Sequence, residues 1–289
     1  MKDAIVHNYI QNTVNITART VNVINQKDFV IEGGVLKKYQ GESVDVVIPN
    51  NVVSIRNDVF SSLKIKSVVI PNSVTEIGNR AFWNCTLLTS VSIPGSVKTI
   101  GNYAFEGCTS LTSVTIFEGV KTIGEYAFQN CAALTSVIIP DSLTDIGECA
   151  FGGCTRLKSV QLSKNLLKIG PRCFSGTAIT KITIPESVQF IGQLAFGVPN
   201  LRKVSFLRTT GTIFLACDAF AGCTTLEEVD ARDGVLQFAA NLLPGETRPH
   251  GDYDDDRWPF YRCSPSLKLP LTDYQVKLKT EGRCIHCGG

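Results

Sequence analysis

The residues in this sequence that are best suited to metal binding or redox chemistry are cysteines. The pair nearest its end has the spacing of a metal site. Cys284 and Cys287 are separated by two residues, and two thiolates at this spacing grip one zinc ion from a tight turn. A closed structural zinc site needs four ligands, so this pair is half a site. Cys263 with His286 or His250 could complete it, and so could a second cysteine pair beyond the end of the printed sequence.

Three interpretations of the pair stay open: an incomplete zinc knuckle formed by Cys284 and Cys287, a tail that holds no metal, or a redox pair. Nothing else in the sequence points to a cofactor. We therefore predict that the protein has no cofactor other than zinc, which this pair could bind. We expect a zinc ribbon, if it forms, to continue past Gly289.

Five other cysteines occupy the same register of a repeated pattern, namely Cys85, Cys108, Cys131, Cys154 and Cys223. Equivalent positions of consecutive repeats lie on one edge of adjacent turns, where packing favours a small apolar side chain with a weak donor. We predict that these thiols are buried structural residues, and neither metal ligands nor redox centres.

The remaining polar residues do not form a catalytic pattern. Only three histidines occur, His7, His250 and His286, and neither a Ser-His-Asp nor a Cys-His arrangement nor a glycine-rich phosphate loop can be placed by pattern. Asp252 and Asp254–Asp256 lack the alternating ligands, the glycine and the glutamate of an EF-hand loop. We interpret this run as a solvated acidic loop, and we predict that the protein is not an enzyme.

The element that positions most of these residues is a repeat of about 23 residues, measured most clearly by phenylalanine. Its steps are 22, 23, 23, 23, 23, 22 and 24 residues, at Phe60, Phe82, Phe105, Phe128, Phe151, Phe174, Phe196 and Phe220. Self-similarity at a fixed period of this length is typical of a solenoid, in which each repeat forms one turn of a continuous core. We refer to one such turn as a rung.

Each rung carries a strand followed by a turn. After each phenylalanine the chain approximates Cys-Thr-x-Leu-x-x-Val-x-Ile-Pro, as in residues 131–140, and the Val and Ile, two positions apart, point to one face of a strand. Stacked copies predict a parallel sheet at about 4.8 Å per rung. An Ile-Gly pair precedes six of the eight phenylalanines, as at Ile100-Gly101. A glycine repeated at this register indicates a turn that needs a positive φ angle or a close backbone approach.

The rung, Leu-x-x-Val-x-Ile-Pro and then Val-x-x-Ile-Gly-x-x-Ala-Phe-x-x-Cys, resembles the BspA-type leucine-rich repeat over roughly residues 46–231. The resemblance implies a β-rich fold of the α/β class: a right-handed leucine-rich-repeat solenoid, curved into a superhelix, with its parallel sheet on the concave face and with capping segments. It also implies a bacterial or protist protein of adhesion or protein recognition. Departures are local: Phe117 and Ser163 replace the proline, Thr177 replaces the cysteine, and residues 208–212 lengthen one rung.

Three regions follow from where the period begins and ends. Residues 1–44 are predicted to form an N-terminal cap with a β-hairpin, because Gly33-Gly34 separates two strand-like runs. Residues 45–231 are the solenoid of about eight rungs. Residues 232–289 are a C-terminal cap and tail, in which residues 235–243 could close the core as a half-rung and the incomplete zinc knuckle follows.

The sheet positions that point outward change character along the array, from serine and threonine to a basic patch and then to the acidic residues of one rung. The patch of Lys158, Lys181, Arg202 and Lys203 is the best candidate for a ligand site, because curved solenoids bind through their concave face. An ordinary solvated face is the alternative. The full candidate set adds neighbouring polar residues and apolar anchors: Gln161, Thr183, Phe117 and Leu207.

We therefore predict a non-enzymatic scaffold that recognises an acidic protein partner through this face. The formal net charge of +2 is too small to indicate nucleic acid or an anionic membrane by bulk attraction, and no apolar run approaches the length of a membrane span. The polar residues near the N-terminus do not suit a signal peptide, and reduced thiols suit a cytoplasmic location. The alternative is a cell-surface adhesin for host or matrix ligands, which the resemblance permits.

Overall fold

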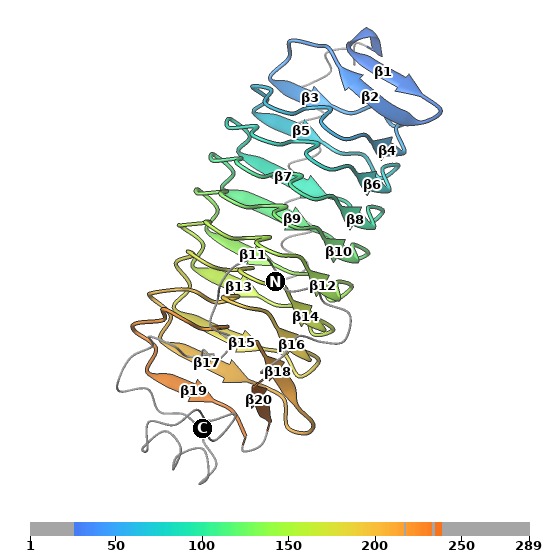
Figure 1. Cartoon of the computed structure of the whole chain (residues 1–289). Helices are drawn as coiled ribbons and strands as arrows, with labels where there is room; N and C mark the ends of the chain where they lie inside the picture. Colours follow the sequence, from blue (N-terminus) through green and yellow to red (C-terminus); the bar gives the residue numbers. More distant parts are fainter. Residues whose placement is uncertain (1–25, 217, 233–234, 239–289) are drawn as a thin grey trace, which may run out of the picture.

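The computed structural model describes residues 26–216, 218–232 and 235–238. Over these residues the chain is an elongated β-solenoid of about eight turns, in which short parallel strands stack along one axis (Figure 1). Within this part of the chain the helical content is the three-residue 3₁₀ helix η1 (Gln26–Asp28). None of the helices described there is long and apolar enough to cross a membrane. The predicted β-rich solenoid is confirmed.

The predicted hairpin is present at the start of the array. Strands β1 (Phe29–Glu32) and β2 (Val35–Tyr39) pair antiparallel. Gly33 and Gly34 connect them with φ angles of 56° and 79°, as the two central residues of a type I′ turn require. Strand β2 also pairs parallel with the first short strand of the array. The hairpin thus extends one of the two columns of strands that run the length of the solenoid (Figure 1).

The first column of strands forms what we call the broad face. Its strands are all parallel to their neighbours: β3 (Asp45–Val47), β5 (Ser67–Val69), β7 (Ser90–Ile93), β9 (Ser113–Ile116), β11 (Ser136–Ile138), β13 (Ser159–Gln161), β15 (Lys181–Ile184), β17 (Lys203–Phe206) and β19 (Glu228–Asp230). The sequence predicted one continuous sheet, but hydrogen bonding divides it into β3-β5-β7-β9, β11-β13 and β15-β17-β19. Both breaks follow a strand whose turn lacks the repeat's proline, at Phe117 and Ser163.

The second column was not predicted. It is a narrow sheet of mostly two-residue strands: β4 (Ser54–Ile55), β6 (Glu76–Ile77), β8 (Thr99–Ile100), β10 (Thr122–Ile123), β12 (Asp145–Ile146), β14 (Lys168–Ile169), β16 (Phe190–Ile191), β18 (Ile213–Leu215) and β20 (Leu236–Phe238). The six strands of this sheet from β6 to β16 each end at the Ile of an Ile-Gly pair. Strand β20 lies past residue 231 and pairs parallel with β18. The narrow sheet therefore continues beyond the point at which the sequence period is lost.

The glycine that follows each of the six narrow strands from β6 to β16 is required by close backbone approach and not by a positive φ angle. A Cβ atom on Gly101 would lie 2.6 Å from the carbonyl carbon of Gly78 in the preceding rung, and one on Gly147 would lie 2.7 Å from the corresponding atom of Gly124. Positive φ angles occur two residues later and on residues with side chains, such as Tyr103 at 59°. Of the two reasons that the sequence suggested for the glycine, the close approach is the correct one.

The core between the two columns is a continuous ladder of phenylalanine rings. The eight repeat phenylalanines are completely buried, and consecutive rings stack with centroids 4.9 to 5.6 Å apart and interplanar angles of 15° or less. Tyr39 of the hairpin extends the ladder, with its ring centroid 5.3 Å from that of Phe60. The inward Val and Ile side chains of both columns surround this ladder.

Candidate functional site

The predicted basic patch lies on the broad face near the C-terminal end of the array. Lys181 and Lys203 are directly opposite each other in the parallel pair of β15 and β17. Arg202 precedes β17, and its backbone N–H donates to the Thr180 carbonyl at 2.8 Å. Lys158 precedes β13 at the position equivalent to Thr180 one rung earlier. The structure thus brings the four cations together across three consecutive rungs.

One of the four cations is neutralised by the next rung, which carries Glu227, Glu228 and Asp230 and which we call the acidic rung. The Nζ atom of Lys203 lies 2.6 Å from Oε1 of Glu228, the residue opposite it in the pair of β17 and β19. The hydrogen bond from Lys203 to Glu228 raises the pKa of the ammonium group, and the neighbouring charges of Glu228 and Asp230 add to the effect. Because this charge already has a partner, Lys203 is less available to a ligand than the sequence suggested.

The other three cations are exposed and, among the described residues, form no ion pair. We name Lys158, Lys181 and Arg202 the basic cluster. Like charges directly opposite each other on neighbouring strands repel, and Lys181 faces Lys203 in this way. The cluster is therefore a positively charged surface that an anionic group could neutralise, bordered in the next rung by Glu227, which lies beside Arg202.

The remaining candidate residues are only partly gathered around the cluster. Gln161 and Thr183 are exposed on β13 and β15 beside it, and Leu207 directly follows β17 with 56% of its surface exposed. Phe117 lies apart, after β9, and is half-buried. Phe117 and Leu207 both occupy the position of the repeat's proline, and their N–H groups donate to the carbonyls of the preceding rung, which proline could not do.

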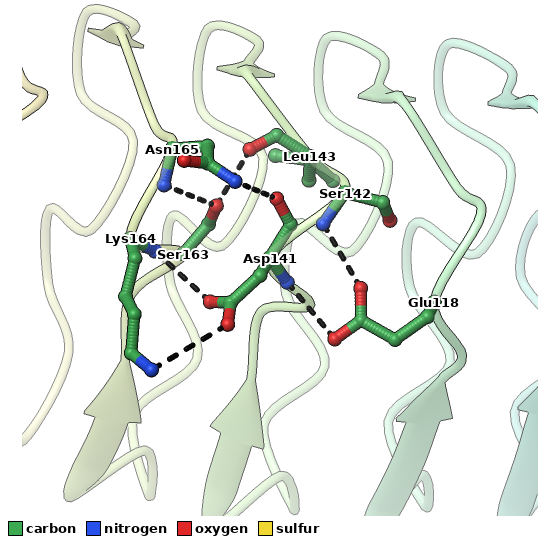
Figure 2. A network of polar contacts seen from close by, with 7 residues as sticks. All are labelled: Glu118, Asp141, Ser142, Leu143, Ser163, Lys164 and Asn165. Atoms are coloured by element: carbon green, nitrogen blue, oxygen red, sulfur yellow. Dashed lines mark hydrogen bonds and ion pairs between the residues drawn. The ribbon is translucent and has the colours of Figure 1, made fainter.

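The turns that follow the broad strands hold a polar network that the sequence did not predict (Figure 2). The Glu118 carboxylate accepts hydrogen bonds from the backbone N–H groups of Asp141 at 3.2 Å and Ser142 at 3.0 Å, both in the next rung. The Asp141 carboxylate in turn accepts from the N–H of Lys164 at 3.0 Å, and the Lys164 ammonium lies 3.8 Å away. Each acidic side chain therefore fastens the turn of the following rung.

Ser163 belongs to the same network and explains one of the departures from the repeat. It is completely buried, and its hydroxyl donates to the Leu143 carbonyl at 2.7 Å and accepts from the N–H of Asn165 at 3.1 Å. Figure 2 shows these contacts bridging two adjacent turns. The missing proline was the only signal of this network in the sequence, and its hydrogen bonds are satisfied within the protein, so we interpret it as structural.

The in-register cysteines are buried, as the sequence predicted. Each Sγ atom donates to the carbonyl oxygen of the phenylalanine one rung earlier, for example Cys131 to Phe105 at 3.3 Å and Cys154 to Phe128 at 3.2 Å. Burial raises the pKa of the Cys85 thiol to about 12 and raises that of Cys131 well above its usual range. The Cys85 and Cys131 thiols are therefore protonated at neutral pH, which suits packing and opposes metal binding or redox chemistry.

We expect the buried cysteines to resist alkylation in the native protein. Even Cys149, whose thiol pKa burial raises to about 11, forms about a hundredfold less thiolate at pH 8.5 than an ordinary cysteine with a pKa of about 8.5. Timed iodoacetamide labelling followed by peptide mass spectrometry should show peptides with Cys85, Cys131 and Cys149 reacting at least about a hundredfold faster in guanidinium than in buffer. Equal rates in the two conditions would contradict the burial.

The same pKa shifts give stability a pH dependence. In the unfolded chain the thiols lose their protons near pH 8.5, whereas in the folded chain they keep them to higher pH. Their contribution is therefore fully present below about pH 8.5 and is lost as the pH rises above it. The urea midpoint under reducing conditions should fall between pH 8 and pH 10, and a variant with Cys149 replaced by alanine should show a smaller fall.

No group of three or more histidine, cysteine, aspartate or glutamate side chains in the described ranges could hold a metal ion. The candidate zinc ligands Cys284 and Cys287 and the acidic run at residues 252–256 lie outside those ranges. The zinc knuckle therefore stays a prediction.

Comparisons with known proteins agree with the architecture. The family model of the BspA type leucine rich repeat region matches residues 38–144 and 121–244. A leucine rich repeat protein from T. pallidum is 27% identical, with 69% of this chain and 88% of that one covered at a TM-score of 0.56. One from Eubacterium ventriosum is also 27% identical, with 60% of this chain and half of that one covered at a TM-score of 0.54.

A third solved structure, described as a leucine rich cell surface protein from Faecalibacterium prausnitzii, is 20% identical over 70% of this chain and 92% of that one, with a TM-score of 0.31. No curated protein sequence matches the chain. The matched repeats cover most of the described residues and coincide with the rungs of the solenoid. The chain belongs to the BspA-type leucine-rich repeat family.

Proposed function

We propose that this protein is a non-enzymatic recognition scaffold that binds an acidic protein through its broad face. The observation that carries the proposal is the basic cluster: three exposed cations on consecutive rungs, without an acidic partner among the described residues, next to a fourth cation that Glu228 neutralises. Membership of a leucine-rich repeat family supports a repeat scaffold. The cytoplasmic location and the alternative role as a cell-surface adhesin stay predictions.

The electrostatics favour a ligand over a purely structural role for these cations. Lys181 has Lys203 on the strand beside it, and cross-strand like charges destabilise a sheet by a few tenths of a kcal/mol to about 1 kcal/mol. The ion pair of Lys203 with Glu228 offsets part of this repulsion, whereas none of the three cations of the cluster forms an ion pair in the described structure. An acidic partner would remove the repulsion and gain the charge complementarity that gives specificity and fast association.

Charge reversal tests this function. The triple variant Lys158→Glu, Lys181→Glu and Arg202→Glu should bind a fluorescent oligo-glutamate peptide at least about tenfold more weakly at low salt, and native-lysate proteins retained by the unmodified chain should be lost. The matched control, Arg56→Glu, Lys98→Glu and Lys121→Glu, makes the same change of net charge next to the narrow sheet and should bind like the unmodified chain. Equal binding by both triple variants would rule out the basic cluster as the site.

A further inference from the structure

The rungs that carry the basic cluster succeed one another at a nearly constant rise along the solenoid axis. Lys158, Lys181 and Arg202 belong to consecutive rungs, whose core phenylalanine rings are 5.6 and 5.4 Å apart. Where neighbouring strands are hydrogen-bonded, as β15 and β17 are, the rise is about 4.8 Å. A partner that follows the axis therefore meets one cation per rung, about every 5 Å along the axis, with Lys181 one residue further along its strand than Lys158 and Arg202.

This rise matches a helical partner better than an extended one. On one face of an α-helix, successive side chains three or four positions apart advance by about 5.4 Å per turn. On one face of an extended strand, side chains two positions apart advance by about 6.7 Å. After two steps the helix is still within about 1 Å of the rungs, whereas the strand is about 3 Å out of register.

We propose that the partner presents an acidic α-helix that lies along the solenoid axis on the broad face, with carboxylates at positions i, i+3 or i+4, and i+7. Each carboxylate faces one cation, in the order Lys158, Lys181 and Arg202. This inference rests on the proposed function, because it specifies the shape of the acidic partner for the same site. It adds the requirement that the carboxylates be spaced like the rungs, which an acidic but unstructured partner does not have to meet.

The acidic rung determines where the acidic stretch of the helix ends. The backbone N–H groups of Glu227 and Glu228 both donate to the Arg202 carbonyl, at 2.9 and 3.1 Å, so these carboxylates come directly after the cluster. Glu227, Glu228 and Asp230 are all exposed, and an acidic residue facing them would be repelled. The helix turn beyond the carboxylate that faces Arg202 should therefore carry lysine or arginine, three or four positions further along the helix.

The rung before the cluster determines the other end of the helix. Ile138 has 40% of its surface exposed and lies opposite Gln161 in the pair of β11 and β13. An exposed isoleucine beside a polar row favours an apolar side chain in the partner, because burying both removes apolar area from water. Along its bound face, the recognised helix thus carries first an apolar residue, then three acidic residues on successive turns, and then a basic residue.

Helical peptides of defined register test this inference. Two stapled peptides should carry one leucine, three glutamates at i, i+4 and i+7, and one lysine, in the two opposite chain directions. A third peptide of the same composition and staple should place its glutamates at i, i+2 and i+5, which spreads them around the helix. Fluorescence anisotropy at low salt should show that one registered peptide binds at least about tenfold more tightly than the scattered one.

The outcomes separate this inference from the function it rests on. If registered and scattered peptides bind equally, and both lose affinity to the triple charge-reversal variant, the helix register is wrong while acidic recognition stands. If no peptide responds to charge reversal of the cluster, the proposed function fails and the inference fails with it. A register effect that is lost in the triple variant and kept in the control variant supports both.

Discussion

Replacing Phe128 with alanine is expected to lower the free energy of unfolding by about 3–5 kcal/mol, the usual cost of truncating a fully buried phenylalanine. Phe128 is 0% exposed, and its ring stacks on Phe105 at 5.2 Å and on Phe151 at 5.3 Å. Both neighbours are held by their own rungs, so the cavity cannot be filled by a small rearrangement. Urea unfolding followed by circular dichroism measures the loss.

The position of Phe128 in the middle of the ladder adds a second effect. In a solenoid each rung contacts only its neighbours, so stability is a sum of rung and interface terms. Removing the ring weakens two interfaces at once, and we expect a broader transition with a lower dependence on urea. Phe128→Leu, which keeps most of the apolar volume, should cost less than half as much. A loss below about 1 kcal/mol for the alanine variant would show that the ladder does not hold the rungs together.

The sequence predicted the core of this fold well because the same core residue types recur in eight repeats. The phenylalanines, the inward Val and Ile residues and the register cysteines recur at one spacing, and a residue type that recurs in a solenoid must meet its own copies in the neighbouring rungs. The hairpin was predictable for a local reason, since Gly33-Gly34 supplies the two positive φ angles of its turn.

The narrow sheet could not be predicted in the same way. A two-residue strand such as β8 has no alternation of apolar and polar residues, which is the signal of a strand. The partners of its backbone groups lie 23 residues away in the neighbouring rungs. The glycine after it was visible, but glycine is compatible with both a turn and a close contact. Stacking of the rungs decides between these readings.

The sequence predicted which residues of the candidate site share a face, but not how their side chains pair across neighbouring strands. The sequence placed Lys158, Lys181 and Arg202 on one outward face, and the structure puts them on consecutive rungs. The sequence could not show that Lys203 is neutralised. The extra residues of the lengthened rung place Glu228 25 positions after Lys203, and not the usual 23. A pair that depends on the register of two strands becomes visible only when the strands are paired.

Substituting a glycine that follows a narrow strand is expected to have the second large effect on stability. Gly101→Ala is expected to destabilise the protein by about 3 kcal/mol, the upper end of the usual cost of overpacking. The new Cβ would lie 2.6 Å from the Gly78 carbonyl carbon and 2.7 Å from the Asn79 nitrogen, and both are backbone atoms. The rungs cannot separate easily at this point, because the Gly101 N–H donates to the Ile77 carbonyl at 2.8 Å.

Gly176→Ala is the matched control for this substitution, because it adds the same methyl group where there is room. Its nearest neighbours would be 3.7 Å away, and its φ angle is +70°, so only backbone strain of about 1 kcal/mol is added. Urea unfolding of the two variants side by side should give a loss about three times larger for Gly101→Ala. Equal losses would mean that rungs can move apart by a few tenths of an ångström without cost. The close approach at Gly101 would then not be what keeps glycine in each rung.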